Sequence, residues 1–110
     1  MASSPEYLAY VLDLLREVPD VTSRKMMGEY LLYAEERLFG GIYDDRFLVK
    51  DTPVTRAILA DTQVPYEGAA PMRLVDMENA DGVVELISTM LPELPVPAPK
   101  RSKKQLQSQS

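Results

Sequence analysis

The side chains that could do chemistry in this sequence are carboxylates, lysines, arginines and tyrosines, because it contains no cysteine and no histidine. The chain therefore has no thiol nucleophile, no imidazole base and no zinc site of the usual kind. It cannot form a disulfide, which suits a reducing compartment. An enzyme with this sequence would have to rely on carboxylates, lysines or tyrosines.

Two acidic pairs, Glu35-Glu36 and Asp44-Asp45, are candidates for such a site. Carboxylate oxygens are suitable ligands for a hard cation, but neither pair has the spacing of an EF-hand loop. Aspartate is also common in tight turns, where its side chain can bond nearby amides. Exposed carboxylates are poor acid–base catalysts at neutral pH. We expect both pairs to be turn residues, and we predict no metal site, no cofactor site and no catalytic residue.

A basic pair opens the most strand-like stretch of the chain, and Gly28 follows it as a kink or bulge. Cations at the start of an exposed strand either keep that edge soluble or contact an acidic partner or a phosphate. Tyr30 and Tyr33 differ in strand parity, so only one of these rings can share a face with a given cation. We predict a contact surface for a protein partner here, formed by Arg24, Lys25, Met26, Met27, Gly28 and Tyr33.

The net charge of −5 is unevenly distributed. Residues 1–99 hold eight basic and seventeen acidic side chains, a net charge of −9, whereas residues 100–110 carry +4. An acidic body is not expected to bind duplex DNA by itself, because phosphate neutralisation needs clustered cations. The tail is a candidate contact for nucleic acid or an acidic partner, or a solubilising end without a partner. Its cations are Lys100, Arg101, Lys103 and Lys104.

Hydrophobic spacing and capping signals predict a two-layer α+β domain. The expected order is helix, three strands, helix, two short extended segments and helix, with the helices packed on an antiparallel sheet. The first two helices are expected at residues 4–18 and 52–61, and a third helix, capped by Asn79 or Asp81, is expected to end at residue 91. The strands of a meander are expected at 30–34, 38–43 and 47–50, and the extended segments at 64–68 and 71–75. Gly40-Gly41 is expected to mark a bulge or a close backbone approach.

Residues 1–92 are expected to form one domain, and residues 93–110 a flexible tail that is rich in proline and then basic. The strands carry apolar groups on both faces, which predicts that a helix or a partner subunit covers the second face. No apolar run approaches the ~20 residues of a membrane span. The N-terminus lacks the basic region of a signal peptide, so we expect a cytoplasmic protein.

Residues 22–33, TSRKMMGEYLLY, resemble the signature of the TfoX/Sxy N-terminal domain family, approximately T-x-R-K-M-F-G-G-Y-G-L-Y. The later segments LF at 38–39, LVK at 48–50, YEG at 66–68 and PM at 71–72 fit the same family in order. Met27, Glu29 and Leu31 depart from the signature, and Glu29 replaces a glycine. Full-length members carry a second, C-terminal helical domain where this chain has its tail, so we expect a stand-alone N-terminal domain.

The resemblance implies a bacterial protein related to regulators of DNA competence, which are thought to act with a cyclic-AMP-receptor-type activator. It implies no catalytic residues. We therefore predict a non-enzymatic module that acts in transcription regulation through protein–protein contact, with weak or indirect DNA contact and no membrane contact. The alternative is a homodimeric, chaperone-like interaction protein of the same fold. An enzyme would require a pocket lined by Tyr66, Arg73 and a buried carboxylate.

Overall fold

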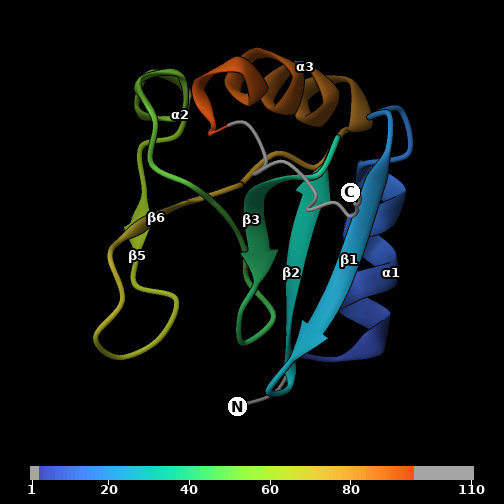
Figure 1. Ribbon diagram of the computed structural model, residues 1–110, viewed down its shortest axis with the longest axis vertical. Coiled ribbons are helices and arrows are strands. Elements are labelled where there is room, and N and C mark those ends of the chain that lie inside the picture. The colour runs from blue at the N-terminus through green and yellow to red at the C-terminus, as the bar shows by residue number, and fades with distance from the viewer. Residues whose placement is uncertain (1–2, 96–110) are drawn as a thin grey trace, which may run out of the picture.

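The computed structural model describes residues 3–95 and arranges them as three helices and a six-stranded antiparallel sheet (Figure 1). The sheet order is β1-β2-β3-β4-β6-β5. The predicted α+β class, with helices packed on an antiparallel sheet, is confirmed. The elements are α1 (Pro5–Leu14), β1 (Val21–Met26), β2 (Glu29–Ala34), β3 (Arg37–Ile42), β4 (Phe47–Val49), α2 (Pro53–Ile58), β5 (Thr62–Gln63), β6 (Met72–Leu74), α3 (Ala80–Met90) and a 3-10 turn (Leu91–Glu93).

Helix starts follow the predicted caps. The Ser4 hydroxyl accepts from the Tyr7 amide at 3.1 Å, and Thr52 and Thr55 form a reciprocal capping box. Helix ends differ from the prediction: α1 ends at Leu14 rather than residue 18, and α2 at residue 58 rather than 61. Leu15 and Val18 are nevertheless buried, because they follow α1 in turns that keep them against the core.

The predicted three-stranded meander has a fourth strand, β1, at its beginning. Gly28 is therefore not a bulge: Met27 and Gly28, with φ of 53° and 85°, form the two-residue turn between β1 and β2. Positive φ at both central residues is what the tight hairpin turn requires. The predicted extended segment at 64–68 is wrong, because β5 lies just before it at Thr62–Gln63 and a turn closed by the Ala69 amide on the Tyr66 carbonyl follows. The predicted segment at 71–75 contains β6 but is longer than this strand.

The core lies between the helices and one face of the sheet. In Figure 1, α1 runs behind the sheet and α3 crosses its upper end. Both helices contribute to one cluster of buried side chains, which extends to Leu94. Tyr30, Leu32 and Ala34 are the members of this cluster from β2, so alternate residues of β2 point to the opposite face. Among residues 3–95, the other face of the sheet thus has no helix packed on it.

Gly40 and Gly41 allow the close approach that the sequence suggested, and the bulge is present as well. The register between β2 and β3 shifts at Leu32/Tyr33 and leaves Phe39 as the extra residue. A Cβ at Gly40 would collide with the Leu48 carbonyl oxygen and lie 2.9 Å from the Val49 Cα. The packing of β4 against β3 therefore depends on a missing side chain.

We predict that Gly40→Ala lowers the free energy of unfolding by about 3 kcal/mol, because backbone atoms cannot move aside for the new methyl group. Gly68→Ala is the matched control: Gly68 has a φ of 89° and open space around it, so it should lose about 1 kcal/mol from backbone strain alone. Urea denaturation of both variants measures the difference. Equal losses would contradict the steric explanation.

Candidate functional site

The face of the sheet without a helix is the first candidate site. Register pairs Arg24 with Leu31, and Tyr33 with Leu38, and these residues alternate with the core positions. Residues paired across antiparallel strands point to the same side. We call this surface the open face; it is formed by Arg24, Met26, Leu31, Tyr33 and Leu38. The prediction that both faces carry apolar groups is thus confirmed for these strands.

Three of the six predicted contact residues share the open face. The Arg24 guanidinium lies 5.9 Å from the centre of the Tyr33 ring, a cation–π arrangement. Met26 belongs to the same face and is 49% exposed. Lys25 does not, because it pairs with the core residue Tyr30. The parity argument, by which only one tyrosine can share a face with a given cation, is therefore confirmed.

The other two predicted contact residues, Met27 and Gly28, lie at the tip of the β1–β2 hairpin. Met27 is 94% exposed there. The predicted tail contacts, Lys100, Arg101, Lys103 and Lys104, lie outside the described residues.

Glu29, which departs from the resemblance, has a structural role at this hairpin. Its carboxylate accepts from the Ser3 hydroxyl at 2.6 Å and from the Asp44 amide at 3.1 Å. The Asp45 carboxylate accepts from the Ser4 amide at 2.9 Å. These bonds connect the start of α1 to the β1–β2 and β3–β4 turns.

Both acidic pairs occupy two-residue turns, as the sequence predicted. The φ angles are 51° and 66° for Glu35 and Glu36, and 55° for both Asp44 and Asp45. Within residues 3–95, no group of three or more histidine, cysteine, aspartate or glutamate side chains is arranged to hold a metal ion.

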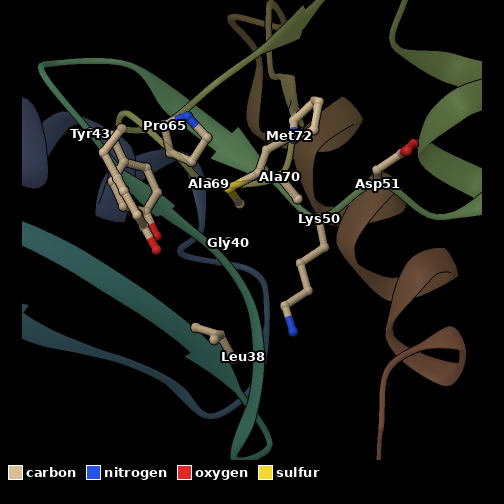
Figure 2. A pocket seen from close by; sticks show the side chains of 11 residues that line it. Leu38, Gly40, Tyr43, Lys50, Asp51, Pro65, Ala69, Ala70 and Met72 are labelled. Atoms are coloured by element: carbon tan, nitrogen blue, oxygen red, sulfur yellow. The ribbon is translucent and has the colours of Figure 1, made fainter.

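A cavity of about 490 Å³ lies beside the open face, between β3, β4 and the segment 64–71 (Figure 2). Most of the side chains that line it are apolar or aromatic, namely Leu38, Tyr43, Pro65, Tyr66 and Met72. Two lining residues are charged, Lys50 and Asp51. The Tyr43 and Tyr66 rings are 6.1 Å apart and tilted by 51°.

Arg46 holds the wall of this cavity in place. Its Nε donates to the Tyr43 carbonyl at 3.0 Å, within the β3–β4 turn. Its two terminal nitrogens donate to the Gln63 side chain at 3.0 Å and to the Val64 and Pro65 carbonyls at 3.3 Å each. One guanidinium thereby connects the turn to the segment 64–71, which is the kind of multiple contact that a planar fork of donors favours.

The cavity was not predicted from the sequence. Two of the segments that resemble the family signature, YEG at 66–68 and PM at 71–72, do contribute lining residues, namely Tyr66, Pro71 and Met72. Tyr66 begins a turn in which the Ala69 amide donates to the Tyr66 carbonyl at 3.0 Å. The apolar residues on the second face of the strands were a sequence signal for this cavity. Leu48 is an example, because it is fully buried yet lies outside the main core cluster. Something had to cover that side chain, and the segment 64–71 lies on this side of the sheet.

Asp51 tests the enzyme alternative, since it lines the cavity near Tyr66 and is bonded to Arg73. Its carboxylate is partly exposed and accepts from Arg56 at 2.9 Å and from Arg73 at 3.0 Å. These hydrogen bonds, Arg56 first, hold its pKa below the ordinary value of 3.8. A lowered pKa makes Asp51 unsuited to proton transfer at neutral pH, so the buried carboxylate that an enzyme would need is not supplied by this residue.

These features define a small α+β domain with one helix-covered face, one open face and a cavity beside it. The chain belongs to the TfoX N-terminal domain family, which matches residues 13–79. It is also similar to a protein of Spirochaeta aurantia described as an uncharacterized 12.7 kDa protein in the trpE 5′ region. The two are 32% identical over 107 residues, which cover 94% of this chain and 93% of the relative. In the part of the chain that the structure describes, no helix has the length and apolar character needed to cross a membrane.

We predict that the Asp51 ion pairs make stability depend on pH. Because the pKa of Asp51 is lowered by folding, its contribution is present above pH 3.8 and is lost as the pH falls through the folded-state pKa. Asp51→Asn should lower the Tm at pH 7, and this difference should shrink toward zero in acid. Asp61→Asn is the control, since no ion pair of Asp61 is found within residues 3–95. A Tm difference for Asp51→Asn that is constant from pH 7 to pH 2 would contradict the assignment.

Proposed function

We propose that this protein is a non-enzymatic interaction module that acts in transcription regulation by binding a protein partner through its open face. The observation that carries the proposal is the cation–π contact between the Arg24 guanidinium and the Tyr33 ring on the open face, beside half-exposed Met26. Arginine, tyrosine and methionine are enriched at protein interfaces, where arginine and tyrosine often dominate the binding energy. Family membership supports the regulatory part of the proposal.

The chemistry of the open face favours a partner that presents an acidic side chain next to an apolar patch. Arg24 supplies the cation, and Leu31 and Leu38 supply apolar surface around Tyr33. The net charge of −9 over residues 1–99 argues against direct binding of duplex DNA by this body. DNA contact in this proposal is indirect or belongs to the basic tail, and the protein acts in the cytoplasm.

Charge reversal at two adjacent positions tests the proposal. Arg24→Glu places a carboxylate on the open face, whereas Lys25→Glu makes the same charge change on the opposite side of β1. We expect Arg24→Glu to reduce recovery of the partner from the native host by at least about tenfold, as loss of an interface arginine does. Lys25→Glu should retain the partner. Quantitative mass spectrometry of tagged protein measures both recoveries.

Transcript profiles test the regulatory role in the same strains. A host that carries Arg24→Glu should resemble a host without the gene, and a host that carries Lys25→Glu should resemble the wild type. Equal behaviour of the two variants would reject the open face as the contact surface. Unchanged transcripts in a host that lacks the gene would reject the role in transcription.

A homodimer is the second candidate, and the position of β1 favours it. β1 is an edge strand of the sheet, and residues Thr22 to Met26 are exposed. Such an edge can pair with the same edge of a second copy. Sedimentation at micromolar concentration distinguishes the two candidates: a monomer would exclude self-association as the function, and a dimer that Arg24→Glu dissociates would make the chain its own partner.

A further inference from the structure

The cavity beside β3 and β4 contains polar and aromatic groups that the proposed protein contact at the open face does not involve. Its volume of about 490 Å³ lies in the range of small-molecule sites, about 300–1,000 Å³. Tyr43 and Lys50 lie on opposite sides of it, with Leu38 between their tips (Figure 2). Apolar walls with a few polar groups are typical of a site for a small organic ligand.

Two polar groups at the cavity have no partner among residues 3–95. The Lys50 ammonium makes no ion pair or hydrogen bond there, although the residue is half-buried. The Tyr43 side chain is 8% exposed, and its hydroxyl makes no hydrogen bond within the same residues. A ligand that accepts a hydrogen bond from either of these donors would therefore gain free energy on binding.

The carboxylate of Asp51 does not neutralise Lys50. It is bonded to Arg56 and Arg73, and it points away from the cavity in Figure 2. The free charge at the cavity is therefore that of one ammonium group. A ligand that fits this charge carries a single negative charge.

The backbone on both sides of the cavity is held before any ligand binds. The Lys50 amide donates to the Phe39 carbonyl at 2.9 Å, and the Lys50 carbonyl accepts from the Thr55 hydroxyl at 2.8 Å. Tyr43 exchanges two backbone hydrogen bonds with Arg46, at 2.9 and 3.0 Å. Because these groups are already ordered, binding costs less conformational entropy than it would in a flexible loop.

We propose that this cavity binds a small aromatic carboxylate, with the ring against Tyr43, Tyr66 and Met72 and the carboxylate on the Lys50 ammonium. The aromatic part fits because tilted rings such as Tyr43 and Tyr66 pack favourably against a further ring. The Tyr43 hydroxyl is a second donor. Burial raises its pKa, with the charge of Tyr66 and Glu29 adding to the effect, so it keeps its proton at neutral pH.

Other ligand classes fit the cavity less well. A polyphosphate or a nucleic-acid segment would need several cations, and one ammonium is available. A neutral apolar molecule would leave the Lys50 ammonium in contact with a buried, uncharged surface. A cationic ligand would be repelled. The monoanionic aromatic acid satisfies both the charge and the walls.

The site goes beyond the proposed function and does not rest on it. The two surfaces meet at Leu38, which lines the cavity and pairs with Tyr33 on the open face. A bound ligand would therefore adjoin the partner-contact surface. The ligand could then change partner affinity, but ligand binding itself can be measured without any partner.

The test uses 2-naphthoate and its neutral amide, 2-naphthamide, with the full chain at 0.15 M salt. We expect naphthoate to shift the backbone NMR signals of Tyr43, Lys50 and residues 66–72, and to bind at least about tenfold more tightly than the amide by calorimetry. Equal affinities, no binding of naphthoate in the millimolar range, or shifts confined to β1 would overturn the proposal. This comparison needs no variant, so it holds whether or not any substitution disturbs folding.

Variants then assign the contacts. Lys50→Met should weaken naphthoate binding by at least about tenfold and leave naphthamide unchanged, because a charge-assisted hydrogen bond is removed. Tyr43→Phe should weaken naphthoate binding about fivefold. Lys25→Met removes the same charge elsewhere and should have no effect; a loss equal to that of Lys50→Met would show a non-specific charge effect and overturn the site. Failure here leaves the comparison of Arg24→Glu with Lys25→Glu unaffected.

Discussion

The hydrogen bonds of the Arg46 guanidinium are the interaction on which the arrangement of the cavity depends. The β3–β4 turn and the segment 64–71 do not pair as strands, yet this side chain donates to Tyr43 on one side and to Val64 and Pro65 on the other. Lysine could not replace it, since a single ammonium on a flexible stem lacks the fixed fork of donors. The position of Pro65, which lines the cavity, follows from this one connection.

A second constraint comes from the tightness of the hairpins. All three turns of the β1–β4 meander have two central residues at positive φ, and five of these six residues are not glycine. Each non-glycine residue in that region has a conformational cost, which the surrounding pairing must offset. At two of the turns, the Glu29 carboxylate and its contacts with Ser3 and Asp44 supply part of the compensation. Glu29, which departs from the family signature, thus helps to stabilise these two hairpin turns.

Features that depend on neighbours in the sequence were predictable, and features that depend on distant residues were not. The caps at Ser4 and Thr52 and the parity of Tyr33 follow from local spacing, and the structure confirms them. β1 was missed because an exposed edge strand carries polar residues and shows no apolar alternation. The cavity was missed because it depends on contacts between Arg46 and residues 63–65, which no periodicity encodes.

The order of strands in the sheet also has a kinetic consequence. β1 to β4 pair with their neighbours in the chain through two-residue turns, so forming them costs little loop-closure entropy. β6 reaches β4 after α2 and the segment 64–71 have been crossed, and β5 pairs with β6 in turn. Because local contacts form faster than distant ones, we expect the meander to assemble first and the β5–β6 pair to dock on it later. Pulsed hydrogen exchange during refolding measures this order. The amides of β2 and β3 should become protected from exchange earlier than the Leu74 amide.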